Sequence, residues 1–283
     1  MLTRGILYGV TGQKYIAEAA QSARFVRKYM PGIPIAIAAP QNEWEGDEFD
    51  EYIKLPEPCP GFLAKVSALS LSPWEQTLFL DSDAYIIHSC TEIFDLLDNF
   101  DIALAHDPWR NGHDVGVPDA FPEFNSGVIA YNMEACRDML KDWEAEFRKH
   151  CESDPRAPDQ ATLRKVMYHS RLRIAPMPME YNFRAGLPSF AGANAAVKLI
   201  HWRTNDPEGL GYQINATLDY RAIFQSVENF DGNTVILSSG GKSIQSLLRL
   251  ISRLRRFTRG QKSSWDITRA KVFETKRQEL ELD

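Results

Sequence analysis

The sequence has few cysteines and no long hydrophobic run, and both shortages narrow the class of protein. The four cysteines among 283 residues are widely separated and form no C-x-x-C pair. This spacing disfavours a disulfide framework or a zinc site and favours buried thiols in a reducing compartment. No stretch approaches the roughly 20 apolar residues of a membrane-spanning helix, and the apolar run near the N-terminus is too short for a signal peptide. We therefore expect a cytoplasmic protein, either free or peripheral on the inner face of a membrane.

The chain also lacks the excess of positive charge that is typical of proteins that bind nucleic acid. Its formal net charge is −6. Residues 242–283 carry eleven Lys and Arg against five Asp and Glu, so the remainder has a net charge of −12. An acidic body does not attract a polynucleotide over a broad surface, so we expect no nucleic-acid partner. The basic segment at the C-terminus needs a separate explanation.

Strand-like and helix-like segments alternate along the first 200 residues, which is typical of an α/β fold with a mainly parallel sheet. Apolar runs predict strands at 6–10, 34–39, 52–55, 77–80, 101–106, 126–131, 173–177 and 197–202, the last being the final strand of the body. Helices are predicted at 15–29, around Lys65, at 133–150 and at 159–168. We expect a globular domain over residues 1–240 and a basic helical extension over 241–283.

The most informative motif is the acidic triplet Asp81-Ser82-Asp83, which directly follows the apolar strand at 77–80. On extended backbone, carboxylates at positions i and i+2 point the same way and lie about 6 to 7 Å apart. Ligands of open α/β sheets bind at the carboxyl ends of strands, where this triplet stands. Because clustered carboxylates repel each other, we expect a hard divalent cation, Mn²⁺ or Mg²⁺, which would also bridge the oxygens of a diphosphate. The alternative is a solvated turn in which Asp81 caps the next segment.

Further segments between residues 5 and 203 match, together with the triplet, the pattern of one enzyme family. These segments are Phe124-Asn125-Ser126-Gly127-Val128, Asp159-Gln160, Tyr181-Asn182 and Leu199-Ile200-His201-Trp202. With Leu78-Phe79-Leu80 and the triplet, they resemble GT-A-fold glycosyltransferases and are most similar to glycosyltransferase family 8, which includes glycogenin and bacterial lipopolysaccharide galactosyltransferases. The resemblance implies a Rossmann-like GT-A fold and metal-dependent transfer of a sugar, with retention of configuration, from a nucleotide-diphosphate sugar such as a UDP-sugar.

The resemblance also implies roles for individual residues. Asp81, Asp83 and His201 would bind the metal. Asn125, Asp159 and Gln160 would act in catalysis at the sugar. All of these residues except His201 would also contact the donor. The other donor contacts would come from Tyr8, Val10, Thr11, Gly12, Lys65, Ser82, Ser126 and Arg203. Family members often carry a lysine shortly after the late histidine; this sequence has none there, and Arg203 would take over the cationic role.

Three of these residues also have a purely structural interpretation. His201 can be a core histidine with satisfied hydrogen bonds. Asp159 can cap the helix that begins after it, since capping needs the same carboxylate. Lys65 can be an exposed lysine on a helix. The sequence leaves these alternatives open.

The acceptor is not encoded in a recognisable motif, but the loop over residues 107–123 offers candidates for its binding. Asp107, Asp119 and Glu123 are candidate acceptor-side groups, and Trp109 and Phe121 present flat apolar faces that suit sugar rings. The acceptor class stays open among a glycan, a lipid-linked molecule and a protein.

The basic segment near the C-terminus predicts an amphipathic helix over residues 244–257. Arg249, Arg253 and Arg256 lie opposite an apolar face. This face consists of Leu247, Leu250, Ile251, Leu254 and Phe257. Such a helix can lie on an anionic membrane, or it can dock on the acidic body of the protein.

Three other functions share parts of this pattern. Phosphatases of the haloacid dehalogenase type place a D-x-D motif on the first strand and add a later acidic pair, and neither feature is found. Sugar-1-phosphate nucleotidyltransferases share the fold and metal chemistry but have a glycine-rich phosphate loop after the first strand, where this chain has Gly12-Gln13-Lys14-Tyr15. A catalytically inactive nucleotide-sugar-binding protein would keep the same motifs and stays an alternative.

Overall fold

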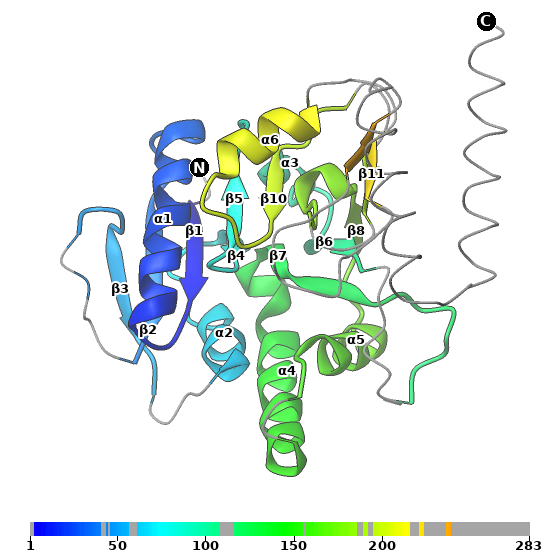
Figure 1. Cartoon of the computed structure of the whole chain (residues 1–283). Helices are drawn as coiled ribbons and strands as arrows, with labels where there is room; N and C mark the ends of the chain where they lie inside the picture. Colours follow the sequence, from blue (N-terminus) through cyan, green and yellow to red (C-terminus); the bar gives the residue numbers. More distant parts are fainter. Residues whose placement is uncertain are drawn as a thin grey trace, which may run out of the picture. The chain divides into compact units, whose positions relative to one another are not determined.

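The computed structural model describes residues 3–40, 44, 46–56, 61–107, 116–154, 157–185, 189–191, 195–215, 221–223 and 236–238. Over these residues the predicted α/β fold is confirmed, with helices flanking a mixed, mainly parallel sheet (Figure 1). The helix predicted at 244–257 lies outside the described residues. The division of the chain at 240/241 stays a prediction.

The central sheet, as far as the chain is described, has seven strands in the order β3-β2-β1-β4-β7-β6-β8. Their bounds are β1 Arg4–Gly9, β2 Ile35–Ala39, β3 Glu51–Lys54, β4 Gln76–Leu80, β6 Ile102–His106, β7 Phe124–Asn132 and β8 Ile174–Met177. The four strands β3, β2, β1 and β4 run parallel to one another, and β8 runs parallel to β6. β7 is antiparallel to both β4 and β6. The carboxyl ends of β1 and β4 therefore meet at one edge of the sheet.

Helices cover both faces of this sheet, which is why its strands are apolar on both sides. The helices are α1 Gln13–Tyr29, α2 Phe62–Leu69, α3 Ile93–Leu96, α4 Met133–Ser153, α5 Gln160–His169 and α6 Pro207–Asn215. Ile6 and Tyr8 of β1 share a core with α1 and α3, whereas Leu7 between them belongs to a second core with α2, α4 and α5. The latter three helices lie side by side on their face (Figure 1).

Packing against the sheet fixes the two helices nearest the carboxyl ends of β1 and β4. The buried face of α1 includes Ile16, Ala19, Ala23 and Val26, spaced as one helical stripe. Gly9, at the end of β1, lets α2 approach closely, because a Cβ at residue 9 would lie 2.5 Å from the Cβ of Ala68 and 3.1 Å from the Cα of Lys65. This packing brings Lys65 next to the carboxyl edge of the sheet.

Short strands outside the central sheet were mostly missed by the sequence analysis. β5 (Ala84–Ile86) pairs antiparallel with β10 (Leu199–His201). The short helix η1 (Met179–Tyr181) is followed by Phe183, whose backbone is hydrogen-bonded to Leu199 and His201 of β10. The expectation that the strand at 197–202 is the last of the body is wrong, because β11 (Arg221–Ile223) and β12 (Ile236–Ser238) follow and form a sheet with β9 (Ser189–Ala191). Strands of three residues are too short to show an alternating pattern.

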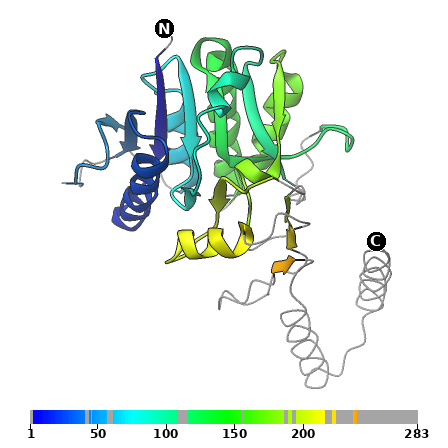
Figure 2. The ribbon, with the colours of Figure 1, turned by 90° about the horizontal axis from the view of Figure 1, so that it is seen from above.

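α6 packs beside β10 and reaches α1 (Figure 2). Ile214 of α6 shares a small apolar cluster with Ile200 of β10 and Ile87. At the other end of α6, Glu208 accepts hydrogen bonds from Lys28 and Tyr29 at the end of α1. The segment after His201 is thus tied to α1.

The cysteines are free thiols wherever the chain is described. Cys90 and Cys136 are buried and Cys151 is half-buried, and Cys59 lies outside the described residues. Burial raises the pKa of Cys90 and of Cys136 to about 12, so both remain protonated thiols at neutral pH. None of the helices described is both long enough and apolar enough to cross a bilayer.

Candidate functional site

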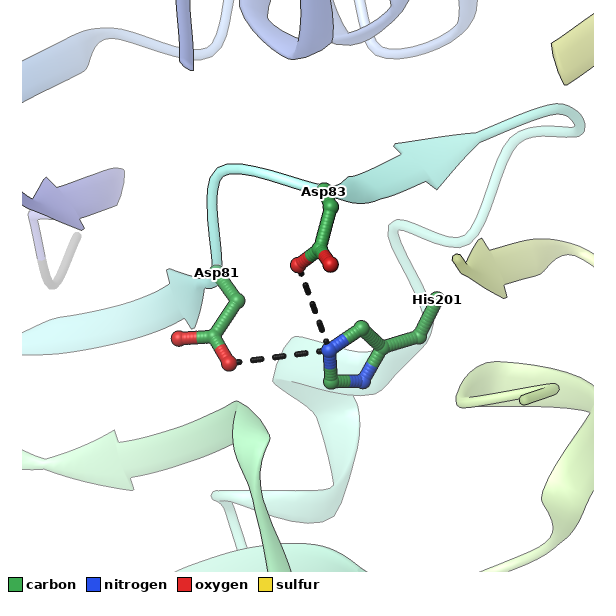
Figure 3. Close-up of side chains that lie close together, drawn as sticks. All are labelled: Asp81, Asp83 and His201. Carbon is green, nitrogen blue, oxygen red and sulfur yellow. Dashed lines mark ion pairs between the residues drawn. The ribbon is translucent and has the colours of Figure 1, made fainter. Parts of the chain in front are cut away.

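The three predicted metal ligands converge at the carboxyl end of β4 (Figure 3). Asp81 follows β4, Asp83 precedes β5, and His201 ends β10, where it pairs with Ala84 of β5. His201 Nε2 lies 3.5 Å from Asp81 Oδ2 and 3.4 Å from Asp83 Oδ1. One candidate ligand atom from each residue lies within 4.8 Å of the other two. Pairing of β10 with β5 is what brings the histidine to the aspartates.

The backbone between the two aspartates is a tight turn, and the expectation of an extended segment is wrong. The Ala84 N–H donates to the Asp81 carbonyl oxygen at 3.0 Å. The turn lets the chain leave the central sheet after β4 and enter β5. Both carboxylates nevertheless point toward His201 (Figure 3). Because a strand follows the triplet, Asp81 does not cap a helix.

Lys65 is a buried cation at this site, so its interpretation as an exposed lysine is wrong. Its residue is 5% exposed. Its Nζ lies 3.1 Å from Asp81 Oδ1 and 3.2 Å from Asp159 Oδ2, and it donates to Ser126 Oγ at 2.9 Å. Burial alone would lower the pKa of Lys65, but the adjacent carboxylates outweigh it and raise the pKa above its ordinary value. Lys65 is therefore charged at neutral pH.

Asp159 stands at the N-cap position of α5, yet its carboxylate makes no capping hydrogen bond. The residue is 3% exposed and its carboxylate faces Lys65. The capping interpretation is therefore wrong. Instead, Trp143 Nε1 donates to the Asp159 carbonyl oxygen at 3.3 Å, which anchors the start of α5 to α4.

The two aspartates of the triplet differ in their pKa. Burial raises the pKa of Asp81 above its ordinary value, even though Lys65 and His201 lie beside it. Burial also opposes ionisation of Asp83, but its contacts with the side chains of His201 and Arg203 prevail and hold its pKa below the usual range. Asp83 is therefore the more readily ionised of the two carboxylates.

Asn125 and Gln160 belong to a buried polar network beside the metal ligands. Asn125 Nδ2 donates to Gln160 Oε1 at 2.9 Å. Gln160 Nε2 donates to Asp107 Oδ2 at 3.0 Å and to Glu123 Oε1 at 3.2 Å. Arg184, which the sequence analysis did not single out, forms an ion pair of 2.5 Å with Asp107. Two predicted acceptor-side carboxylates are thus joined to two predicted catalytic residues.

Of the other three acceptor-side candidates, the structure describes Asp119 and Phe121. Asp119 is exposed. The ring of Phe121 packs edge-on against Phe124 and Tyr168, with centroid separations of 6.0 and 5.3 Å. Trp109 lies outside the described residues.

The predicted nucleotide-binding residues lie where β1 gives way to α1. Tyr8 is fully buried and its hydroxyl lies 2.8 Å from Ser22 Oγ. Val10 is buried, whereas Thr11 is half-buried and Gly12 is exposed. Gly12 has a φ of +87°, which favours glycine at the turn into α1. Because β1 and β4 are neighbours, this turn belongs to the same sheet edge as the triplet; the donor-binding roles stay predictions.

Glu18 on α1 links the triplet to Arg203, a connection that the sequence analysis missed. It accepts hydrogen bonds from Ser82 Oγ at 3.0 Å and from Arg203 Nε at 2.9 Å. The Arg203 guanidinium also lies 5.6 Å from the ring centroid of Tyr15. A glutamate on the polar side of an amphipathic helix carries no sequence signal for such a contact.

Gly127 lies against the side chains of Asp81 and His201, and its lack of a side chain leaves them room. A Cβ at residue 127 would lie 2.1 Å from His201 Cε1 and 2.7 Å from Asp81 Oδ2. We expect Gly127→Ala to displace both side chains and to weaken Mn²⁺ binding by about 10- to 100-fold, corresponding to about 1–3 kcal/mol of overpacking. The dissociation constant can be measured by titration of free Mn²⁺ with electron paramagnetic resonance.

Gly32→Ala is the matched control for this substitution. Unlike Gly127, Gly32 has a positive φ, of +84°, and nothing lies within 4 Å of its virtual Cβ. This variant is expected to lose some stability and to bind Mn²⁺ as the wild type does. Equal Mn²⁺ affinity of Gly127→Ala and the wild type would contradict the assignment of a metal to this cluster.

Comparison with known proteins finds a similar fold in solved structures. No protein-family model and no curated protein matches the chain. The glycosyltransferase GlyE of Streptococcus pneumoniae TIGR4 is similar with a TM-score of 0.53 and 16% identity, over 74% of this chain and 60% of GlyE. Its apo form gives the same score and identity, over 75% of this chain and 60% of GlyE.

A second solved structure is that of the galactosyltransferase LgtC in complex with donor and acceptor sugar analogs. Its TM-score is 0.51 at 16% identity, over 71% of this chain and 87% of LgtC. The chain thus spans most of LgtC but only 60% of the length of GlyE. At these identities the likeness concerns the fold, and it confirms the predicted resemblance: the chain has the fold of GT-A glycosyltransferases.

Proposed function

We propose that this protein is a metal-dependent glycosyltransferase that transfers a sugar from a nucleotide-diphosphate sugar, specifically a UDP-sugar, to an acceptor with retention of configuration. The observation that carries the proposal is the convergence of Asp81, Asp83 and His201 beside the buried Lys65. This cluster stands at the sheet edge where α/β proteins bind ligands, in a fold shared with two glycosyltransferases. That LgtC was solved with donor and acceptor sugar analogs supports sugar transfer as the reaction class.

The donor set fits a divalent cation. Two carboxylates and one imidazole nitrogen suit Mn²⁺ or Mg²⁺, and three protein ligands leave coordination positions for diphosphate oxygens. The missing side chain at Gly127 keeps space beside Asp81 and His201. A cation bound there would neutralise the negative charge that develops on the leaving diphosphate.

The surrounding residues can be assigned by their position relative to this cluster. We assign Asn125, Asp159 and Gln160 to the sugar and the reacting face. Asp159 pairs with Lys65, which also pairs with Asp81. Asn125 accepts a hydrogen bond from the backbone of Gly127, which is itself hydrogen-bonded to the backbone of Asp81. We assign the turn at Thr11 and Gly12, with Tyr8 and Val10, to the nucleoside. Ser82, Ser126 and Arg203 would complete the contacts with the donor, with Arg203 supplying a positive charge for the diphosphate.

The acceptor side of the proposal rests on the carboxylates that contact Gln160. Asp107 and Glu123 both accept hydrogen bonds from Gln160, and Asp107 also accepts one from Asn125, so an acceptor hydroxyl would approach from the loop over residues 107–123. The acceptor would be a glycan, a lipid-linked molecule or a protein. A cytoplasmic location, and contact of residues 244–257 with the inner face of a membrane, belong to the same proposal.

Metal removal tests the proposal directly. The full chain is incubated with each of a panel of nucleotide-diphosphate sugars carrying labelled sugar, with glycan, lipid-linked and protein acceptors, and with Mn²⁺ or Mg²⁺. We expect release of the nucleoside diphosphate and transfer of the label from one donor, loss of both with a chelator, and recovery when metal is restored. Prior thermal-shift screening of donor and metal pairs identifies the donor without knowledge of the acceptor.

Two outcomes would favour the alternatives. Pyrophosphate release from a nucleoside triphosphate and a sugar 1-phosphate would indicate a nucleotidyltransferase. A stabilised complex with a nucleotide sugar but no released diphosphate and no transferred label, whatever acceptor is offered, would indicate a binding protein without turnover.

A further inference from the structure

Asn182 is hydrogen-bonded to the ring nitrogen of His201 that faces away from the aspartates. Asn182 Oδ1 lies 3.0 Å from His201 Nδ1, while His201 Nε2 faces Asp81 and Asp83. We propose that Asn182 is a positioning residue, which fixes the tautomer and the orientation of His201 so that Nε2 offers its lone pair to the metal. This inference rests on the metal site of the proposed function.

The direction of the hydrogen bonds is set by a backbone group. The Gly127 N–H lies 3.0 Å from Asn125 Oδ1. A backbone N–H is always a donor, so the atom of Asn125 that meets it is the amide oxygen. The amide nitrogen of Asn125 then points to Gln160 Oε1 and Asp107 Oδ2, both of which can accept.

The same logic passes through Asn182 to the imidazole. Asn182 meets the Asn125 oxygen at 2.8 Å, so it must present its Nδ2 donor there. Its Oδ1 therefore faces His201 Nδ1 and can only accept. The proton of the neutral imidazole is thereby held on Nδ1, and Nε2 is left with a lone pair.

Burial of these residues makes a reversed direction of the hydrogen bonds costly. Asn182 is 0% exposed, Asn125 3% and His201 9%. Water has little access to replace a misdirected donor, so the opposite tautomer would leave polar atoms of Asn182 and His201 facing each other as two acceptors. A lone pair on Nε2 directed at two carboxylate oxygens is in turn favourable when a cation lies among them.

Metal affinity tests the role of Asn182. Asn182→Leu keeps a similar size but removes both the acceptor for Nδ1–H and the donor for Asn125, and we expect Mn²⁺ to bind about 10- to 100-fold more weakly. Asn182→Asp keeps an acceptor in either protonation state, so we expect it to retain most of the wild-type affinity. Affinity is measured by electron paramagnetic resonance titration of free Mn²⁺, and folding by circular dichroism.

Tyr181→Phe is the control for loss of a hydrogen bond from the same turn. The Tyr181 hydroxyl donates to Glu92 Oε1 at 2.6 Å and does not take part in the chain of hydrogen bonds to His201. This variant is expected to bind Mn²⁺ as the wild type does. If folded Asn182→Leu also did so, the positioning role would be overturned. If the wild type itself bound neither Mn²⁺ nor Mg²⁺, the proposed function would fail with it.

The tautomer can be observed without any variant of Asn182. In the ¹⁵N-histidine spectrum of the wild type, recorded with Mg²⁺ and at a pH at which imidazole is neutral, we expect Nδ1 of His201 to give the signal of a protonated ring nitrogen. Comparison with His201→Gln identifies its signals among those of the six histidines. A proton on Nε2 in this spectrum would refute the inference, whatever the Mn²⁺ affinities are.

Discussion

On the proposed function, sugar transfer by the Asp83→Asn variant is expected to fall about 100- to 1,000-fold below that of the wild type, as for loss of one group that stabilises charge in a transition state. The amide has the shape of the carboxylate but lacks its negative charge, so the metal would be held less well against the diphosphate. The backbone at this residue stays intact, because the Trp202 N–H donates to the Asp83 carbonyl oxygen at 2.9 Å. The rate of nucleoside diphosphate release at saturating Mn²⁺ measures the effect.

Asp142→Asn serves as the matched control for this experiment. Asp142 is an exposed residue of α4, remote in sequence from the cluster, and its substitution removes the same charge from the chain. It should leave the rate unchanged. Wild-type turnover by folded Asp83→Asn would show that residue 83 does not hold the metal.

The strands that carry the triplet could be predicted from the sequence because they are long enough and buried on both faces. β4 is apolar from Leu78 to Leu80 and ends directly before Asp81, so its length and its polar end were both visible. β7 was predicted two residues short at its start, because Phe124 and Asn125 precede the plainly apolar run. The order of the strands and the antiparallel setting of β7 are long-range properties that no local pattern contains.

The position of His201 was accessible from resemblance and not from local physics. β5 and β10 have three residues each, and nothing in such short runs indicates that they pair with each other. The turn at Asp81–Ala84 is a consequence of that pairing, since the chain must leave the central sheet to reach β10. For this reason the expected extended geometry of the triplet was wrong, although its convergence with His201 was predicted.

Lys65 carried a signal that the sequence analysis did not use. α2 is apolar nearly all round, and every residue from Leu63 to Leu69 is buried. A helix without a polar face is buried, so a lysine in its middle must have found negative partners. Glu18 and Asn182 offered no comparable signal, because their contacts join residues that are distant along the chain.

The buried ammonium of Lys65 leads to the largest expected change in stability. Lys65→Met is expected to lower the free energy of unfolding by about 3–5 kcal/mol in the presence of a chelator, because it leaves Asp81 and Asp159 as buried charges without their cation. Urea unfolding monitored by circular dichroism measures the change. The double variant Lys65→Met/Asp159→Asn should be more stable than the single variant, since one of the two unpaired charges is gone.

A lysine in a surface ion pair provides the contrast to Lys65. Lys165 on α5 pairs with Glu146 at 2.5 Å, with the side chains 37% and 30% exposed, so Lys165→Met should cost at most about 1 kcal/mol. Because burial raises the pKa of Asp81 in the folded protein, its ionised form costs stability at neutral pH, and this cost disappears as the pH falls below the pKa of the unfolded chain. Loss of Lys65 increases that cost, so the difference between Lys65→Met and the wild type should narrow as the pH is lowered toward about 4. If the difference in the free energy of unfolding between Lys65→Met and the wild type were small and independent of pH, Asp81 and Asp159 would not need Lys65 to offset their negative charges.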